Sequence, residues 1–276
     1  MKIKMKKTSS ISLLVLIFGV VSCGSSSEPP ASSIPENSLS VTTPASAKSD
    51  DFSVDGVLTD FVTNNENSLP DVTKTGGRYR ANLIDNTDNI TLHFNGYQGR
   101  LDAKRVSFPF EFIARNIGIG TQADSQQAKS SSGNSFIFAG VQVHVIDLDS
   151  RNSSHIVVGH RGTTSFTLEG KNTVGDASGA GVSTVDDMGA NVVPSGRADL
   201  RVVGNVDRSL TIYWQPPEQA EDNWRLYEGF DNGNGQLPGV APNYGAEVYV
   251  GLITYAQDAN DIPFVGTCDA IEIYEK

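Results

Sequence analysis

The pattern of apolar residues from residue 50 onward constrains the fold of this chain more than any other feature. Short runs rich in Val, Ile, Phe, Tyr and Thr alternate with clusters of Gly, Asn, Asp and Pro, and no run has the period of an amphipathic helix. We therefore predict one all-β domain over residues 50–276, built from two stacked antiparallel sheets. The expected strands are 89–95, 106–116, 135–147, 155–162, 165–170, 197–204, 210–215, 247–255 and 267–274.

The order of these strands is similar to that of a known superfamily. The segments are, in chain order, FPFEFIARN, AGVQVHV, SHIVVGHRG, ADLRVVG, SLTIYWQ, EVYVGLITYA and CDAIEIYEK. This succession, over residues 108–274, resembles the concanavalin A-like lectin/glucanase jelly roll, in particular its laminin G-like and xylosidase C-terminal-like modules. The resemblance implies a concave sheet that commonly faces carbohydrate, and it implies no particular chemistry.

Residues 139–162, AGVQVHVIDLDSRNSSHIVVGHRG, hold three of the four histidines and predict a β-hairpin. A turn centred on residues 149–152 would pair His144 with Val157, Gln142 with Gly159 and Val141 with His160. Alternation of side chains then gives a core face and a polar face. We expect the core face to carry Val141, Val143, Val145, Ile156 and Val158. We expect the polar face to bind ligand through Gln142, His144, His155 and Arg161, with Gly159 as an open notch that lets a sugar ring approach.

A long segment rich in Pro, Gly and Asn follows the strand at 210–215 and contains Trp224, Tyr227 and Phe230. Aromatic side chains in such a segment are costly to expose without a purpose. Two interpretations stay open: the segment covers a sheet edge, or it touches ligand. Trp224 is therefore a further candidate ligand-binding residue.

The sequence argues against a glycoside hydrolase. Such enzymes need two carboxyl groups that flank the scissile bond, and the glucanases of the resembled superfamily place Glu-x-Asp-x-x-Glu along one strand. The nearest stretch here, VIDLDS, lacks both glutamates, and its Asp147 and Asp149 lie where the strand enters a turn. Glu111 is a lone strand carboxylate that could equally pair with a neighbouring arginine.

Three functions remain, and the first is our prediction: carbohydrate binding on the concave sheet. The second is a polysaccharide lyase acting on uronate-containing glycans by β-elimination, which needs a group that neutralises the uronate, a base and an acid. His144, Arg161 and Tyr213 could supply these groups, although the signature motifs of the alginate lyases do not appear. The third is a protein-interaction or adhesion module without enzymatic activity.

Charge and composition limit the partners and cofactors. The formal net charge of −11 argues against nucleic acid, because phosphate binding needs a basic face. A structural Ca²⁺ is conceivable at Asp231, Asn232 and Asn234 in DNGNG, but the EF-hand spacing is absent and a plain turn is the favoured interpretation. We expect no required cofactor, and we expect Cys268 to be a buried, inert thiol.

The N-terminus predicts export and membrane anchoring. Lys2, Lys4, Lys6 and Lys7 precede the apolar run ISLLVLIFGVV, which has the length of a signal-peptide core and is too short to span a bilayer. The following VVSC resembles the lipobox of bacterial lipoproteins. That resemblance implies a signal peptide over residues 1–22 and lipidation of Cys23. Removal of four lysines and no acids with this peptide would change the formal charge from −11 to −15.

The segment between this cysteine and the domain is rich in Ser, Pro, Thr and Ala and has no aromatic residue. It cannot bury enough apolar area to offset its ordering entropy. We therefore expect residues 23–49 to form the lipidated cysteine and a disordered tether. In lipoproteins of bacteria with two membranes, an aspartate after the cysteine is associated with retention in the inner membrane. Gly24 occupies that position here, so we expect the outer membrane, with the domain facing the periplasm or the surface.

Overall fold

A computed structural model describes residues 45–82, 99–120, 136–161, 166–179, 181–184, 196–217, 219–228, 234–257 and 265–275 of the 276-residue chain. These residues form two antiparallel β-sheets, as predicted, and a single 3-10 turn, η1 (Glu66–Ser68). No helix within the described ranges is long and apolar enough to cross a membrane.

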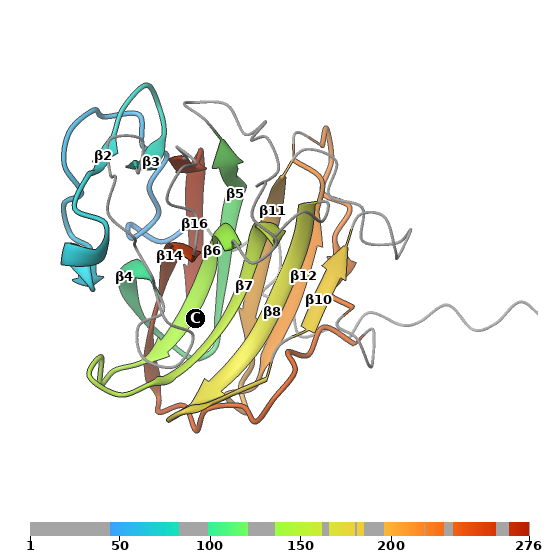
Figure 1. Ribbon diagram of the computed structural model, residues 1–276. Coiled ribbons are helices and arrows are strands. Elements are labelled where there is room, and N and C mark those ends of the chain that lie inside the picture. Colours follow the sequence, from blue (N-terminus) through green and yellow to red (C-terminus); the bar gives the residue numbers. More distant parts are fainter. Residues whose placement is uncertain are drawn as a thin grey trace, which may run out of the picture. The chain divides into compact units, whose positions relative to one another are not determined.

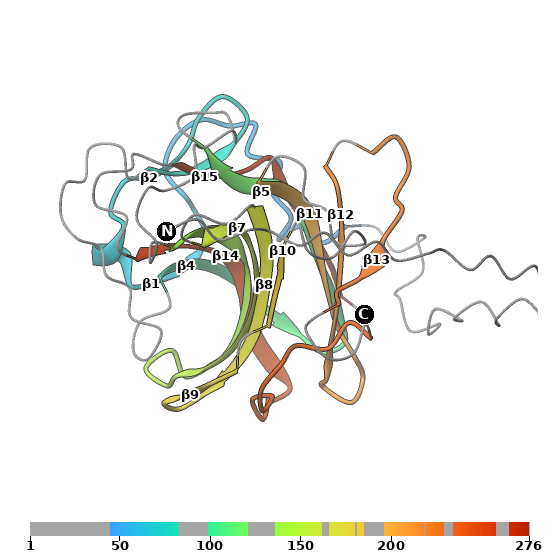
Figure 2. The same ribbon diagram turned by 45° about the vertical axis from the view of Figure 1, so that its right-hand side comes forward.

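The first sheet, here called sheet B, has the strand order β1-β4-β14-β6-β7-β8-β10, with β9 paired to β8. In Figure 2 the strands of sheet B are strongly curved, and the face that points away from the second sheet is concave. Its strands are β1 (Val62–Asn64), β4 (Arg100–Ser107), β6 (Phe136–Val145), β7 (Asn152–Arg161), β8 (Phe166–Val174), β9 (Ala177–Ser178), β10 (Gly181–Thr184) and β14 (Glu247–Gln257).

The second sheet, sheet A, lies along the convex side of sheet B (Figures 1 and 2). Its order is β13-β12-β11-β5-β15-β3-β2, with β16 paired to β5. Its strands are β2 (Val72–Lys74), β3 (Tyr79–Asn82), β5 (Phe110–Gly120), β11 (Arg197–Gly204), β12 (Leu210–Gln215), β13 (Arg225–Leu226), β15 (Val265–Cys268) and β16 (Ala270–Glu275).

Most expected strands match observed ones, and two of them prove to be pairs of strands. The expected strand at 106–116 is the end of β4 and most of β5, separated at residues 108–109, because Pro109 has no N–H to donate to a ladder. The expected strand at 267–274 is divided into β15 and β16 at Asp269, and the expected strand at 89–95 lies outside the described residues.

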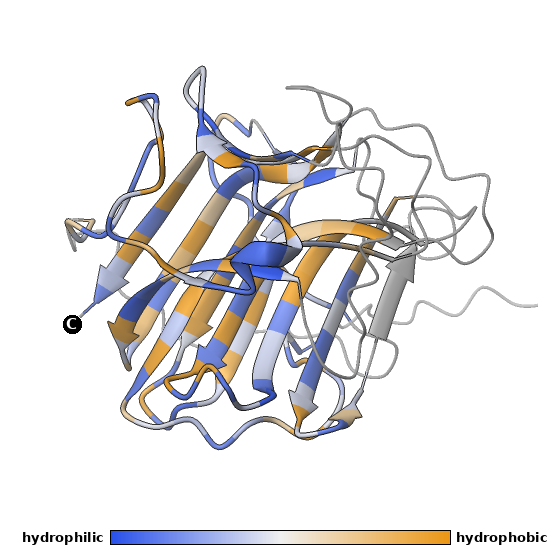
Figure 3. Cartoon of the chain, turned by 60° about the vertical axis from the view of Figure 1, so that its left-hand side comes forward, coloured by the Kyte–Doolittle hydropathy of each residue, from blue (hydrophilic) through white to orange (hydrophobic). Residues whose placement is uncertain are grey.

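Alternation along the strands builds the core between the sheets (Figure 3). Apolar residues from the inner faces of both sheets form one continuous cluster, as period-2 patterning requires. It includes Val141, Val143, Ile156 and Val158 of the predicted hairpin, and Val145 packs against it. Cys268 belongs to the same cluster, and burial raises the pKa of its thiol far above the usual value, as expected for an inert cysteine.

The described chain begins at residue 45 and contacts the last strand at once. The Ser46 amide donates to the Ile273 carbonyl at 2.7 Å, and Lys48 Nζ lies 2.7 Å from Glu275 Oε2. Residues 46–49, which the sequence assigns to the tether, thus already hydrogen-bond to β16. A run of Ser, Ala and Lys shows no strand pattern, but an available backbone edge is sufficient to order it.

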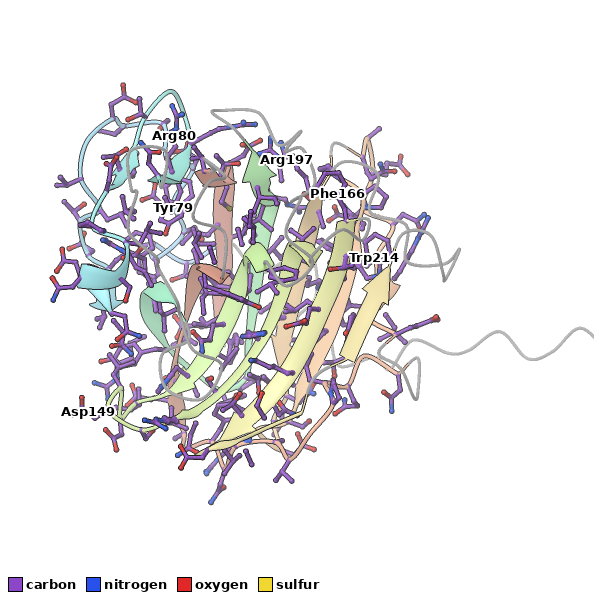
Figure 4. The ribbon with its side chains drawn as sticks, viewed as in Figure 1. Tyr79, Arg80, Asp149, Phe166, Arg197 and Trp214 are labelled. Atoms are coloured by element: carbon purple, nitrogen blue, oxygen red, sulfur yellow. The ribbon has the colours of Figure 1, made fainter. Side chains whose placement is uncertain are left out.

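A buried ionic network holds the segment before β4 against sheet B. Asp102 is fully buried, accepts hydrogen bonds from the Arg100 guanidinium and accepts one from Tyr79 Oη at 2.9 Å (Figure 4 labels Tyr79). Thr63 donates to the same carboxylate at 2.7 Å. The Asp102 carboxylate thus accepts hydrogen bonds from three side chains, which is the condition for burying an ion pair without a large penalty.

Candidate functional site

The concave face of sheet B carries the polar side chains predicted for the hairpin. The register of β14, β6, β7 and β8 places outward-pointing residues in rows across the four strands. One row is Tyr249, His144, Ser153 and Thr173; the next is Gly251, Gln142, His155 and Lys171; the third is Ile253, Gly140, Val157 and Glu169. We call these rows and the neighbouring Tyr255 the concave-face site.

The register of the hairpin differs from the predicted one, although the assignment of faces is right. His144 pairs with Ser153, and Gln142 pairs with His155, whereas the predicted partners, Val157 and Gly159, lie further along β7. The turn is centred two residues earlier than expected, because the Asp147 carbonyl accepts hydrogen bonds from the backbone and side chain of Ser150. A displacement by an even number of residues keeps each side chain on its face.

Gly159 is therefore not a notch beside Gln142. It pairs with Phe138 at the far end of β6, and a Cβ at this position would lie 1.9 Å from the Ile137 carbonyl oxygen. Glycine is required here for the close approach of two strands rather than for the approach of a ligand.

Side chains of the concave-face site are buried to a greater degree than an open trough would predict. His144 is 5% exposed and His155 3% exposed, while Tyr249 is partly exposed. Gln142 Nε2 donates to Ser153 Oγ at 2.8 Å, and His144 Nδ1 donates to the Val145 carbonyl at 2.8 Å. The sheet thus holds these groups in fixed orientations, as recognition requires.

Burial also sets the charge of the two histidines. Desolvation lowers the pKa of His144, and it lowers the pKa of His155 well below the usual value, with the Lys171 ammonium acting in the same direction. Both imidazoles are neutral at neutral pH. His155 Nε2 is buried and has no hydrogen-bond partner within the described part of the chain, and such unsatisfied groups are rare in native structures.

Several residues of the site were not predicted, among them Glu169, Lys171 and Tyr255. Tyr255 Oη donates to Glu169 Oε1 at 3.3 Å, and the Tyr255 ring lies 5.8 Å from the His155 ring, centroid to centroid. Burial lowers the pKa of Lys171 to about 8, and the Glu169 carboxylate acts against that change. The expected strand at 165–170 ended one residue too early to include Lys171. The signal that could have found both charges is their spacing, because residues two apart on a strand share a face.

Tyr213 and Trp224 do not join this site. Tyr213 lies on β12, on the outer face of sheet A, with the Arg201 guanidinium 4.9 Å from the centre of its ring. Trp224 packs on Arg115 and Arg201, at 5.3 and 5.7 Å from its ring centre. His144 and Tyr213 therefore point away from opposite sides of the sandwich, and the described residues do not assemble the lyase set of His144, Arg161 and Tyr213.

The segment around Trp224 covers the sandwich, which is one of the two interpretations that the sequence left open. Tyr227 is fully buried, and its hydroxyl accepts a hydrogen bond from the Gly170 amide at 3.0 Å. Asn172 donates from Nδ2 to the carbonyls of Leu237 and Gly239. The segment thus links the edge of sheet A to β8 of sheet B, while Phe230 lies outside the described residues.

Carboxylates on the outer face of sheet A are paired with arginines. Arg201 forms a two-pronged ion pair with Glu111, at 2.8 and 3.1 Å, so Glu111 has the arginine partner considered for it. Arg115 lies 2.6 Å from Glu272, 2.7 Å from Asp222 and 3.2 Å from Asp199. Burial alone lowers the pKa of Arg115, but hydrogen bonds to Asp222 and Glu272 outweigh burial and raise it overall.

The remaining predicted residues lie in the β6–β7 turn, in other loops or outside the described set. The backbone of Arg161 ends β7, but its side chain and that of His160 lie outside the described set, as do Cys23, Asp231 and Asn232. Asn234 Oδ1 accepts the Gln236 amide at 3.1 Å, which is the hydrogen bond of a side-chain-stabilised turn. Asp147 and Asp149 lie in the β6–β7 turn, with Asp149 at its tip (Figure 4). In the described ranges, no three His, Cys, Asp or Glu side chains gather to hold a metal ion.

Comparison with known proteins identifies the fold. No family model matches the sequence, and no curated protein does. A xylan beta-1,4-xylosidase from Bacillus halodurans C-125 is similar, at 14% identity and a TM-score of 0.50, over 84% of this chain and 40% of that one. A bifunctional GH43-CE protein from Bacteroides eggerthii is similar at 12% identity and a TM-score of 0.52, over 83% and 26%. A beta-glucanase from Bacillus licheniformis is similar at 12% identity and a TM-score of 0.39, over 83% and 97%.

These likenesses concern the fold. The chain is a concanavalin A-like jelly-roll sandwich, as the order of its strands predicted. It spans 40% and 26% of the lengths of the first two proteins.

Proposed function

We propose that this domain binds carbohydrate on the concave-face site. The observation that carries the proposal is the set of polar side chains on the concave face, among them Gln142 and His144, which the sheet holds in fixed orientations. A sugar hydroxyl can donate or accept a hydrogen bond, so it can satisfy either tautomer of a neutral imidazole. The partly exposed Tyr249, in the row of His144, offers an aromatic surface of the kind that apolar sugar faces contact.

The similarity to a protein that is named for xylan supports the same proposal by analogy of fold. A single carboxylate, Glu169, faces outward from the described rows of the site, whereas retaining and inverting glycosidases use two. The described rows therefore lack the second carboxylate that hydrolysis would require, whereas their polar side chains are sufficient for binding a sugar.

The test is binding of the purified full chain to an array of polysaccharides, combined with an absorbance assay for unsaturated sugar ends. We expect binding to at least one polysaccharide without release of unsaturated ends. Release of such ends would instead indicate a lyase, and absence of binding to every polysaccharide would favour a protein partner and contradict the proposal.

The proposal includes attachment of the domain to the bacterial outer membrane through lipid on Cys23. The basic, apolar and VVSC segments of the N-terminus support it. One acyl chain gives only marginal membrane binding, so the several chains of a bacterial lipoprotein are needed. In cells, we expect Cys23→Ser to move the protein from the detergent phase to the aqueous phase, and an unchanged distribution would contradict lipid attachment.

A further inference from the structure

Arg80 on β3 forms no hydrogen bond or ion pair with any residue in the described part of the chain. Its neighbours along the strand, Tyr79 and Ala81, belong to the core, so Arg80 points from the outer face of sheet A. Its side chain is partly exposed. On the same face, Arg115 and Arg201 are paired with carboxylates. The ion pairing of this face therefore does not extend to Arg80.

The residues on either side of Arg80 are threonines. Thr73 of β2 and Thr267 of β15 pair with it directly across the sheet. Side chains that face each other in this way are within contact distance. The guanidinium thus lies between two hydroxyl groups, where most strands of this face would supply a carboxylate. A partly buried cation loses hydration, and an acceptor from outside the described chain would compensate for that loss.

The carboxylates two residues along each neighbouring strand already have other partners. Asp269 Oδ1 lies 2.6 Å from Arg78 Nε, and its Oδ2 accepts a hydrogen bond from Asn116 Nδ2 at 2.7 Å. On the other side, Asp71 Oδ2 accepts from Asn82 Nδ2 at 2.9 Å. These contacts explain why the guanidinium on β3 has no ion pair even though acids are near it in the sequence of the strands.

A second guanidinium reaches the same point from the other side. Arg197 of β11 extends across β5, and its Nη2 donates to Thr267 Oγ1 at 3.0 Å. Gly118 lies beneath this side chain, and a Cβ there would be 2.8 Å from Arg197 Cγ. Thr267 therefore has an arginine on each side, and Figure 4 labels both of them near the upper end of the sandwich. Two such groups repel each other, and an anion beside them would offset the repulsion.

We propose that the outer face of β3 binds an oxyanion, that is, a phosphate, sulfate or carboxylate group, through the guanidinium of Arg80. A guanidinium presents parallel N–H donors that match two oxygens of such a group. The partly exposed Thr73 hydroxyl beside it can donate a further hydrogen bond. The site belongs to sheet A, whereas the concave-face site belongs to sheet B, so it is independent of the proposed function.

The first experiment identifies the anion. The purified full chain is titrated by calorimetry with sodium phosphate, sodium sulfate and sodium glucuronate in turn, at two ionic strengths set with sodium chloride. We expect saturable binding of at least one of the three, weakened at the higher ionic strength. Binding of phosphate or sulfate alone assigns a tetrahedral group, and binding of glucuronate alone assigns a carboxylate. Absence of saturable binding in all three titrations would overturn the proposal.

The second experiment tests the contact. The formal charge of the chain is −11, so an anion must be held by local groups. We expect Arg80→Ala to weaken binding about tenfold, and Arg80→Lys, which keeps the charge without the paired donors, to have a smaller effect. Arg151→Ala is the matched control, because it removes the same charge from an exposed position in the β6–β7 turn, and we expect no change.

Circular dichroism establishes that each variant is folded before affinities are compared, and Arg80→Gln replaces Arg80→Ala if the latter does not fold. Equal affinity of the wild type and a folded variant without the guanidinium would overturn the site. Polysaccharide binding by the same variant should equal that of the wild type. The oxyanion site and the concave-face site can therefore fail separately.

Discussion

The outer faces of the two sheets both bury polar groups, but arginine–carboxylate pairs stand on sheet A and neutral histidines stand on sheet B. On sheet A, Arg201 and Arg115 are matched by carboxylates from neighbouring strands and from the segment at Asp222, and Trp224 packs over both guanidinium groups. On the concave face of sheet B, the histidines are neutral, and one imidazole nitrogen has no partner in the described chain.

This difference separates a stabilising surface from a recognition surface. Arginines and carboxylates that already pair with one another have few hydrogen bonds left to make with a ligand. Removing one member of such a pair should therefore affect stability. A rigid polar group that the described residues do not satisfy can gain a hydrogen bond only from something added, so its loss should affect binding.

Glu111→Gln should destabilise the domain most. Arg201 would lose its ionic partner in a largely buried position, and breaking such a pair costs about 3 kcal/mol. Urea denaturation measures the loss, and carbohydrate binding should be unchanged. Glu221→Gln removes an exposed carboxylate and is the control. Equal stabilities of the two variants would mean that the Glu111–Arg201 ion pair contributes no more to stability than an exposed carboxylate does.

Lowering the pH should destabilise the domain through the histidines on the concave face of sheet B. The unfolded chain protonates His155 near pH 6.5, whereas the folded chain resists protonation because its pKa is well below the usual value. Stability is therefore complete above pH 6.5 and falls as the pH decreases below that value. His144 adds to the same trend.

Thermal denaturation from pH 7 to pH 5 measures this loss, and His155→Gln should reduce it. The range lies above that in which Asp222 titrates, since hydrogen bonds from Arg115 lower the pKa of this carboxyl below its usual value. An identical pH dependence of stability in wild type and His155→Gln would show that His155 is not the group responsible for the loss.

Ser153→Ala should have a smaller effect. It removes the acceptor of the Gln142 amide, a buried hydrogen bond worth about 1 kcal/mol. We expect the affinity for carbohydrate to fall as well, because the Gln142 side chain loses part of its orientation. Loss of stability without loss of affinity, seen by urea denaturation and titration of the same sample, would remove Gln142 from the binding surface.

Trp224→Leu should have the smallest effect. It keeps an apolar cover and removes the stacking of two arginines on the indole, worth roughly 0.5–1 kcal/mol at such a partly exposed position. Binding should not change, since Trp224 lies on sheet A. A marked fall in affinity would restore Trp224 as a ligand-binding residue and blur the contrast between the two faces.

Local sequence patterns were sufficient for the fold and for the two faces of the hairpin. The Val141, Val143, Ile156 and Val158 alternation placed these residues in the core, and it did so even with the turn displaced. The pairing partners within the hairpin were predicted wrongly, because they depend on which carbonyl closes the turn. The Asp147 carbonyl closes it by accepting from Ser150, and residue spacing does not reveal this.

Contacts between distant strands could not be predicted in the same way. Tyr255 and Glu169 meet because β14 inserts between β4 and β6, an order that no local pattern encodes. Tyr213 was grouped with His144 because aromatic and polar alternation looks the same on either sheet. The sequence contains the chemistry of each strand, but only the topology says which strands share a surface.

The antiparallel contact of residues 46–50 with β16 has a practical consequence. The Asp50–Ile271 bridge and the Lys48–Glu275 ion pair bring the two ends of the domain side by side on one edge. A few glycines could therefore join position 275 to position 46, and new ends could be opened in the 146–151 turn. Such a circular permutant should keep the sandwich, and it would offer a direct means of mounting the domain on a surface from the tip of its hairpin.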